Sequence, residues 1–142
     1  MSYTGGCNCG AIRYEINAEP IRAGHCPCRD CQRMSGTGHA SHIGFPKPAV
    51  MVQGKATHWE KATDSGNKAT RAFCPTCGAP VYTTNSGMPD FFIVEAASLD
   101  DPSRFVPQMV VYTSSGFAWD HIDPALPRFA MPPGCASSWL SS

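Results

Sequence analysis

The chain has 142 residues, a length typical of one domain. Its 11 basic and 11 acidic side chains cancel, which argues against nucleic acid and anionic membranes as partners, because both select a basic surface. The N-terminal segment lacks the basic and apolar stretches of a secretory signal, and no apolar run is long enough to span a bilayer. We therefore expect a soluble, cytoplasmic protein.

Short segments with the pattern of β-strands follow one another along the chain, separated by 13 glycines and 13 prolines. Residues 11–16 alternate strictly, with Ile12, Tyr14 and Ile16 on one face of the predicted strand. Seven further segments have a similar strand character, and they are residues 39–45, 49–54, 57–62, 68–74, 79–85, 91–99 and 108–114.

Helical signals are confined to two short stretches. Residues 29–36 can form a turn or two of helix. Farther along, Asp100 or Asp101 can cap a short turn whose first helical position is taken by Pro102.

These patterns predict a mostly-β fold of short antiparallel sheets, with few short helices and with metal-binding turns that tie the sheets together. No linker or repeat divides the chain, so we expect a single domain over residues 1–142. The segment from about residue 120 to residue 142 is rich in proline and ends in polar residues. We expect this segment to run over the surface and to fray at its end.

Seven of the eight cysteines stand in tight C-x-C and C-x-x-C clusters, which suit a metal better than disulfides between distant strands. Cys7 and Cys9 form one pair, and Cys74 and Cys77 form another. Each pair is too small to complete a tetrahedral site, and together they predict a structural zinc site with four cysteine ligands. Gly78 follows the second pair, where a positive φ lets backbone N–H groups point at the sulfurs.

A third cluster has three cysteines, Cys26, Cys28 and Cys31, which is one ligand short of a closed zinc site. A zinc site with three protein ligands keeps a position open for chemistry, so we predict a second, open and labile site here. A fourth ligand can instead come from one of several other residues, namely His25, His39, His42 or Cys135. His39 and His42 stand three apart on a predicted strand, so they point to opposite faces and at most one of them faces the cluster.

A rival partition of the cysteines also has to be considered. Cys28 and Cys31 with Cys74 and Cys77 would form a four-cysteine site from two C-x-x-C pairs. This partition leaves the three remaining clustered cysteines without a site, and its spacer is long for a zinc ribbon.

Five stretches together resemble a known family, the glutathione-dependent formaldehyde-activating enzymes and their centromere-protein-V-like relatives. These stretches are GGCNCGAIRYE, HCPCRDCQRMSG, FCPTCGAPVY, VEAASLDDPSRFVP and FAWDHIDPALPRF, and they occur in the family's order over nearly the whole chain. The two C-x-C elements and the C-x-x-C-G element are specific for membership of the family. They are much less specific for the reaction of a given member.

The resemblance implies a β-tent fold (Mss4-like), a structural zinc on the first and last cysteine pairs, and a second, labile zinc on the three-cysteine cluster. It also implies the reaction of an S-(hydroxymethyl)glutathione synthase, in which glutathione adds to formaldehyde. One position departs from the family, whose members usually carry histidine between the first two cysteines of the active cluster. Here that residue is Pro27, which has neither a backbone N–H nor an imidazole, and His25 next to the cluster can compensate.

The leading functional hypothesis is a zinc-dependent carbon–sulfur lyase or synthase that acts on a thiol adduct of a small aldehyde, with the three-cysteine cluster as its catalytic centre. The partners would be glutathione or a similar thiol, together with a small aldehyde. The alternatives are a non-catalytic zinc-binding module and a thiol redox or zinc sensor, and Pro27 favours the first of these.

Other residues near the cluster have less specific expectations. Arg29 and Arg33 flank it and can contact the carboxylates of glutathione, although surface charges of this kind are often only solvated. The large aromatic residues are expected in the core rather than along a substrate wall, and they are Trp59, Phe91, Phe92 and Trp119.

Overall fold

A computed structural model describes residues 2–63 and 66–130, and it has eleven strands and one α-helix. The strands are β1 (Tyr3–Gly6), β2 (Arg13–Ile16), β3 (Arg22–Cys26), β4 (Ala40–Pro46), β5 (Val50–Gln53), β6 (Thr57–Ala62), β7 (Lys68–Phe73), β8 (Pro80–Asn85), β9 (Met88–Glu95), β10 (Met109–Val111) and β11 (Arg128–Phe129). The helix is α1 (Arg29–Ser35), and the short 3-10 turns are η1 (Lys47–Ala49), η2 (Ala96–Ser98), η3 (Pro102–Arg104) and η4 (Thr113–Ser115).

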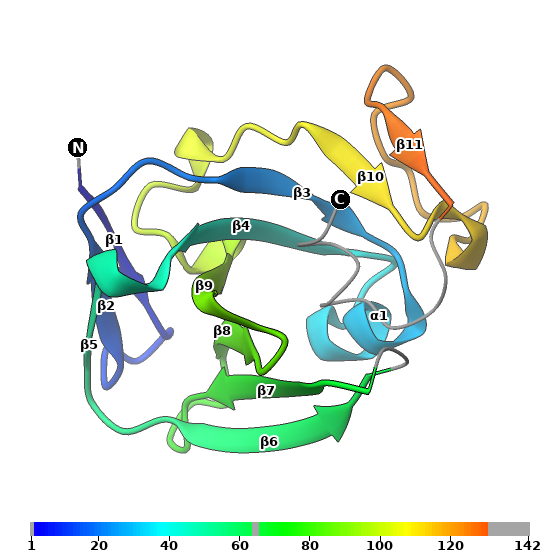
Figure 1. The fold of residues 1–142 in the computed structure, drawn as a ribbon. Coiled ribbons are helices and arrows are strands. Elements are labelled where there is room, and N and C mark those ends of the chain that lie inside the picture. Colours follow the sequence, from blue (N-terminus) through cyan, green and yellow to red (C-terminus); the bar gives the residue numbers. More distant parts are fainter. Residues whose placement is uncertain (1, 64–65, 131–142) are drawn as a thin grey trace.

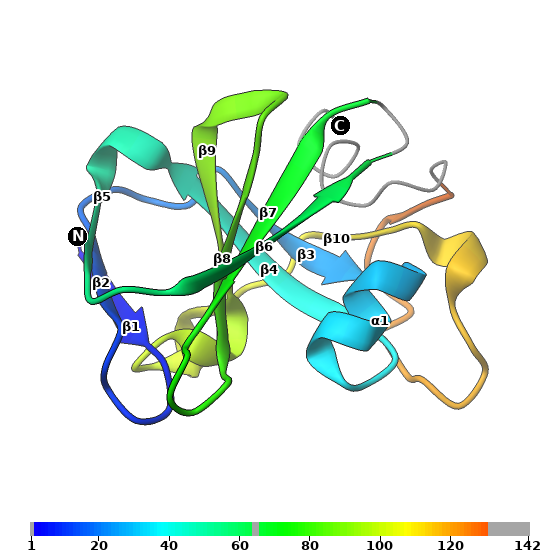
Figure 2. The same ribbon diagram turned by 90° about the horizontal axis from the view of Figure 1, so that it is seen from below.

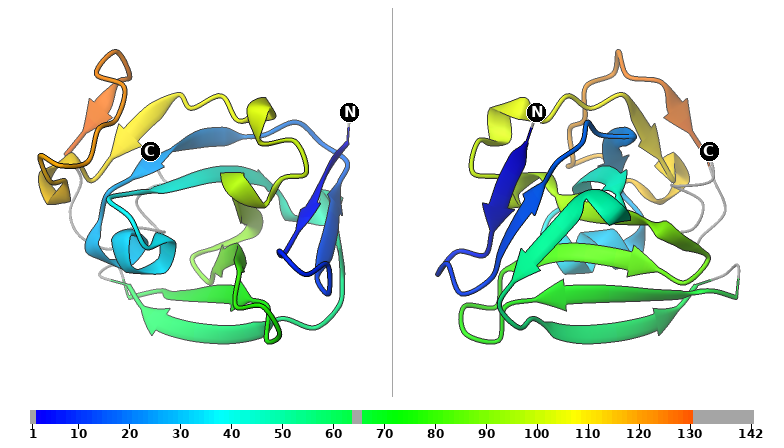
Figure 3. Two further views of the ribbon diagram at one scale, coloured as in Figure 1. Left: turned by 180° about the vertical axis from the view of Figure 1, so that it is seen from behind. Right: turned by 60° about the vertical axis from the view of Figure 1, so that its left-hand side comes forward.

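The strands form two sheets (Figure 1). The small sheet has the order β1-β2-β5, and the large sheet has the order β11-β10-β3-β4-β9-β8-β7-β6. All pairs are antiparallel except those of β10 with β3 and with β11. The small sheet and β11 lie at opposite ends of the large sheet (Figure 3). The expected mostly-β class with short antiparallel sheets and few short helices is confirmed.

Each of the eight predicted strand segments overlaps a strand of the structure, although β9 begins three residues earlier than predicted, at Met88. Two predicted segments are too long, because β9 ends at Glu95 in the turn η2 and β10 ends where Tyr112 takes a left-handed conformation with φ of 58°. The sequence analysis missed β1 and β3, since glycines interrupt the alternation in both strands. It also missed the two-residue strand β11.

Both predicted helical stretches are confirmed. The helix α1 ends at Gly36, which has a φ of 74° and donates its N–H to the carbonyl of Gln32 at 2.9 Å. In η3, Asp101 rather than Asp100 is the cap, because its side chain accepts from the N–H of Ser103. None of the helices in the described part of the chain has the length and apolar character needed to cross a bilayer. Residues 120–130 of the C-terminal segment are mostly exposed, as expected, whereas its expected frayed end and Cys135 fall within residues 131–142, outside the described residues.

Two apolar clusters are buried on the two faces of the large sheet. The first cluster includes Phe45 and Val94 and joins the small sheet to the large one. The second includes Ile93, Val111 and Tyr112, and it surrounds the three-cysteine cluster. The three-cysteine cluster therefore lies in the protein core and not in a surface loop.

The expectation that the large aromatic residues lie in the core is only partly correct. Phe92 is buried and Phe91 packs against the second cluster, but Trp59 and Trp119 are 53% and 64% exposed. Trp59 is on β6, the edge strand of the large sheet, where only one neighbouring strand covers the backbone.

Asp100 connects the small sheet to the segment after β9. Its carboxylate accepts from Nη1 of Arg13 at 2.9 Å and from Oγ1 of Thr4 at 2.7 Å. The Arg13 guanidinium and the Thr4 hydroxyl lower the pKa of Asp100 to about 2. The ionised form of this carboxylate therefore stabilises the fold.

Replacing Asp100 with asparagine should make stability less sensitive to acid. The pKa of an unfolded aspartate is about 3.9, which is higher than that of Asp100 in the folded protein. Between about pH 4 and about pH 2 the unfolded chain therefore binds more protons than the folded one, and stability falls as the pH drops. Because the groups are partly exposed, the effect should be below about 1 kcal/mol. Urea unfolding at about pH 6 and about pH 3 measures it, with the exposed Asp90→Asn as control. Equal acid sensitivity of wild type and Asp100→Asn would contradict the assignment.

Candidate metal centres

Two turns from distant parts of the chain bring the first four cysteines together. The turn between β1 and β2 carries Cys7 and Cys9, and the turn between β7 and β8 carries Cys74 and Cys77. All four sulfurs lie within 4.8 Å of one another. The Sγ atoms of Cys7 and Cys9 are 3.7 Å apart, and those of Cys9 and Cys74 are also 3.7 Å apart.

These sulfur positions fit a tetrahedral zinc ion. With a Zn–S distance of about 2.3 Å, neighbouring ligands of a tetrahedron are separated by about 3.8 Å. Backbone N–H groups also point at the sulfurs, because Ile12 donates to Cys7 Sγ at 3.2 Å and Thr76 donates to Cys74 Sγ at 3.3 Å. Donors of this kind favour the thiolate form, which is the form that binds a metal.

The backbone conformation of both turns suits this arrangement. Gly10 and Gly78 have φ values of 84° and 76°, which confirms the expected positive φ at Gly78. Burial disfavours the thiolate of Cys7, but the N–H of Ile12 and the neighbouring thiols outweigh it and lower the pKa of Cys7 to about 6. Although the N–H of Ala11 lowers it, the pKa of Cys9 is raised to about 11 by Cys74, burial and the other thiols, so this thiol loses its proton only when a cation binds.

The three-cysteine cluster is assembled by the junction of β3 and α1. Cys26 ends β3, Cys28 is the N-cap of α1, and Cys31 lies in its first turn. The N–H of Cys31 donates to Sγ of Cys28 at 3.4 Å, which fixes the capping side chain. All three sulfurs lie within 4.8 Å of one another, so the structure does not form the rival site of Cys28 and Cys31 with the last pair.

The second cluster differs from the first in its surroundings. Cys26 and Cys31 are 0% exposed and Cys28 is 6% exposed, whereas Cys9 is exposed in the first site. The thiol of Cys31 lowers the pKa of Cys28 to about 7, and burial raises the pKa of Cys31 well above its ordinary value. The charge of Arg71 acts on both thiols and favours their ionised forms.

No histidine, aspartate or glutamate in residues 2–63 and 66–130 places a ligand atom within 4.8 Å of all three sulfurs. Within that part of the chain no fourth ligand joins the three sulfurs, and Cys26 is disulfide-bonded, so it has to be reduced before the cluster could bind a metal. The same cysteines are closed off from solvent, a feature that the spacing in the sequence could not indicate.

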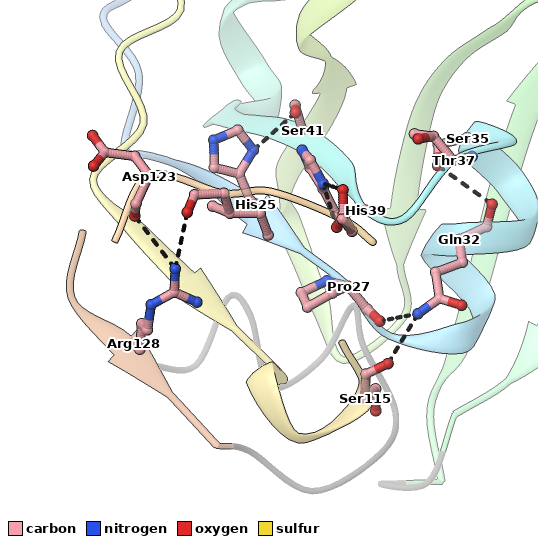
Figure 4. A network of polar contacts seen from close by, with 12 residues as sticks. His25, Pro27, Gln32, Ser35, Thr37, His39, Ser41, Ser115, Asp123 and Arg128 are labelled. Carbon is pink, nitrogen blue, oxygen red and sulfur yellow. Dashed lines mark hydrogen bonds and ion pairs between the residues drawn. The ribbon is translucent and has the colours of Figure 1, made fainter. Parts of the chain in front are cut away.

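The nearby histidines have other partners (Figure 4). Nδ1 of His25 lies 2.9 Å from Oγ of Ser41, and its ring meets the His39 ring edge-on at a centroid distance of 4.8 Å. His39 pairs with Asp120, whose Oδ2 lies 2.8 Å from Nδ1. Burial and the neighbouring His39 lower the pKa of His25 to about 4. His25 is not a ligand of the cluster, because neither ring nitrogen lies within 4.8 Å of all three sulfurs.

His42 is the histidine on the sheet face that carries the cluster. His42 is paired with Gly24 on β3 and with Glu95 on β9. Directly paired residues lie on the same face of a sheet, and so do residues two apart on one strand, such as Gly24 and Cys26. Nε2 of His42 lies 3.2 Å from Oε2 of Glu95, and both side chains are buried. The expectation that His39 and His42 point to opposite faces agrees with these partners. The sequence analysis missed Glu95, because only the register between β4 and β9 brings it to this position.

Gln32 holds the cysteine loop in place. Its Nε2 donates to the carbonyl of Pro27 at 2.7 Å and to the carbonyl of Ser115 at 3.0 Å, as Figure 4 shows. Arg29 donates to the other end of the amide, and its guanidinium lies over the Phe117 ring at 5.9 Å. Gln32 is only 5% exposed, so these bonds form away from bulk water. Arg29 thus supports the loop, and Pro27 contributes a carbonyl and a buried ring at the position that departs from the family.

These features together define a class of protein: a mostly-β chain with two cysteine clusters that could hold metal ions. Residues 2–115 match the family model described as glutathione-dependent formaldehyde-activating enzyme. The chain belongs to this family.

Two individual proteins are similar to the chain. A protein of Halomonas elongata, provisionally named as a glutathione-dependent formaldehyde-activating enzyme, is 24% identical over 115 residues, which cover 78% of this chain and 73% of that protein. A crystal structure of a Rhodobacter sphaeroides protein, a structural genomics target, has a TM-score of 0.56 at 20% identity and covers 89% of this chain and 98% of that chain. The second likeness supports the fold alone.

Removing the first metal site should unfold the protein, whereas removing the second should not. A structural zinc contributes on the order of 10 kcal/mol to folding, so Cys74→Ala should abolish the cooperative thermal transition or lower its midpoint by more than about 10 °C. Cys28→Ala is the matched control, because it removes one sulfur from the other cluster. Thermal unfolding with zinc counted per chain tests this, and equal destabilisation by both variants would contradict the division of roles.

Replacing Gln32 with glutamate should loosen the cysteine loop. The change keeps the shape and the acceptor for Arg29, but it removes the two N–H donors and leaves the carbonyls of Pro27 and Ser115 unsatisfied. We expect a loss of about 1–3 kcal/mol in unfolding free energy. The control is Gln53→Glu on the exposed strand β5. If urea unfolding gives the same stability for both variants, the amide of Gln32 does not hold the loop.

Proposed function

We propose that the protein is a zinc-dependent carbon–sulfur lyase or synthase that acts on the thiol adduct of a small aldehyde, in the manner of an S-(hydroxymethyl)glutathione synthase. Family membership supports the general activity. One structural observation carries the mechanism: the sulfurs of Cys26, Cys28 and Cys31 converge, and no fourth ligand from the described residues joins them. A metal held by three protein ligands keeps one coordination position for a substrate sulfur.

The reaction joins a thiol and a carbonyl. The sulfur electron pair forms the S–C bond, the carbonyl π pair moves to oxygen, and that oxygen takes the proton that the thiol loses. A zinc ion on the three cysteines would stabilise the thiolate form of the substrate sulfur, and the thiolate is the nucleophile. The apolar walls of Ile93, Val111 and Tyr112 keep bulk water away, so that the aldehyde meets sulfur rather than hydroxide.

The remaining elements of the proposal follow from the cysteines. We propose two zinc ions per chain, one on Cys7, Cys9, Cys74 and Cys77 and one, more labile, on the three-cysteine cluster. The cytoplasm is the proposed site of action, because a reducing compartment would keep the first four cysteines as free thiols and would reduce the disulfide of Cys26. Glutathione and formaldehyde are the proposed thiol and aldehyde, and residues 1–142 are proposed to form one domain with the β-tent arrangement.

A non-catalytic zinc module, or a redox or zinc sensor, is the second candidate. One observation that favours it is the complete burial of Cys26 and Cys31, which leaves a substrate no direct path from solvent to these sulfurs. Cys26 is also disulfide-bonded in the structure, and its sulfur has to be reduced to a thiolate before it can bind zinc. The residue Pro27 adds to this argument, because it places a buried ring where an imidazole could have exchanged a proton.

The exchange rate between glutathione, formaldehyde and their adduct tests the proposal. Magnetisation-transfer NMR at equilibrium measures this rate without a coupled enzyme. The reduced, zinc-loaded wild type should accelerate exchange, and Cys28→Ser and Cys31→Ser should lower the acceleration at least about 100-fold, the scale on which loss of a catalytic group is felt. Met51→Ser, at an exposed position on β5, should keep the wild-type rate.

The two candidate functions give different outcomes in this experiment. If the reduced, zinc-loaded wild type leaves the exchange rate at its uncatalysed value, the lyase proposal is wrong and the binding module or sensor is favoured. If Cys28→Ser retains the full acceleration, catalysis takes place elsewhere on the protein.

A further inference from the structure

A cavity of about 370 Å³ lies between the helix α1 and the strands β6, β7 and β8. Asp30, Arg33 and Met34 line it from the helix, and Trp59 and Arg71 are among the residues that line it from the sheet. Figures 1 and 2 show the helix beside this end of the sheet. The volume is in the range of cavities that bind small organic molecules.

Much of the wall is apolar and aromatic. Met34, Trp59, Phe73 and Tyr82 all line the cavity. Trp59 is 53% exposed, so a large aromatic surface stands open beside a hollow instead of being covered by the protein. A flat apolar group bound there would cover this surface and gain both burial and ring stacking.

The charges of the cavity do not cancel. Three cations line it, Arg33, Lys61 and Arg71, against the single carboxylate of Asp30. Lys61 and Asp30 form an ion pair with each other. In the part of the chain that the structure describes, no carboxylate lies within ion-pair distance of Arg33 or Arg71. Two guanidinium groups are therefore left to face a ligand.

Arg71 is the better placed of the two cations. It is half-buried, and its hydrogen bond among the described side chains is a long one, from Nη1 to Oγ1 of Thr83 at 3.5 Å. Its guanidinium therefore keeps most of its donors for a partner, and a planar carboxylate can take two of them at once. Two parallel hydrogen bonds from the half-buried guanidinium of Arg71 to a carboxylate would orient the ligand as well as bind it.

The cavity is connected to the three-cysteine cluster by one row across the sheet. Trp59 pairs with Arg71, Arg71 with Thr83, and Thr83 with Ile93, so these four side chains share one face. Ile93 belongs to the buried cluster that surrounds Cys26, Cys28 and Cys31. A ligand on Arg71 therefore lies on the side of the sheet that carries the cysteines.

We propose that this cavity binds a small organic carboxylate with an apolar, aromatic-type body, holding the carboxylate on Arg71 with Arg33 nearby and the ring against Trp59. The cavity suits such an anion better than a zwitterionic peptide, because three cations line it against one carboxylate, which already pairs with Lys61. The ligand proposed for this cavity is therefore neither formaldehyde nor glutathione, and the site goes beyond the proposed function.

Calorimetric titration with 2-naphthoate and its neutral isostere 2-naphthamide tests the site. Wild type should bind the naphthoate about tenfold or more tightly than the amide, because a hydrogen bond to a charged group is worth more than one to a neutral group. Arg71→Gln should remove this preference, while Trp59→Ala should weaken both ligands alike. Lys68→Gln is the matched control, since it removes a cation from the same strand outside the cavity and should bind as wild type does.

Two results would overturn the proposal. One is equal affinity of wild type for naphthoate and naphthamide, and the other is unchanged naphthoate binding by Arg71→Gln. A third probe, S-methylglutathione, separates this proposal from the proposed function, because it cannot react. If it binds and naphthoate does not, the selectivity proposed for the cavity is wrong while the lyase proposal stands. If naphthoate binds as expected and the adduct exchange is not accelerated, the cavity is a binding site and the lyase proposal is wrong.

Discussion

Four sulfurs converge where the two sheets meet, and a metal bound there would be the one strong link between their turns. The three-stranded and eight-stranded sheets share no strand, and backbone contacts between the small sheet and the segment after β9 include the Gly5–Leu99 bridge and the bond from Asp100 to Thr4. The turns that carry the first and last cysteine pairs therefore add to the apolar core that already packs the small sheet against the large one. A metal ion there would replace the repulsion among four thiolates with four strong bonds.

The large sheet separates two chemical environments, because side chains of a strand alternate between its faces. One face carries His25 and Ser41 with the core that contains Phe45. The other carries the three-cysteine cluster, the His42–Glu95 pair and Arg71, with α1 packed over it. Polar groups inside the protein are costly unless they are paired, and the second face brings three cysteines, a buried histidine–glutamate pair and a cation together, which makes it the candidate face for chemistry.

The family relationship bears on the general activity, whereas the local geometry bears on how the three-cysteine cluster is held and how deep it lies. Membership of the family rests on features that run along the whole matched region, and it supports the general activity. The cluster itself is deeper than an open site in a surface cleft would be, and the loop that carries it is fixed by Gln32 through the carbonyl of Pro27. At the position where the family usually has histidine, this chain uses packing and a backbone acceptor.

The class of the fold, most of the strands, the short helix and the membership of both cysteine clusters could be predicted from the amino-acid sequence. This was possible because alternation with period two and C-x-C spacing are local properties of the chain. The folded chain was needed to see that Cys26 and Cys31 are closed off from solvent, that Glu95 meets His42, that Trp59 is exposed, and that Arg71 lines a cavity on the face of the cluster. These facts depend on the register between strands and on the packing of α1. Both are set by the sum of many contacts between residues far apart in the chain, and no short segment encodes them.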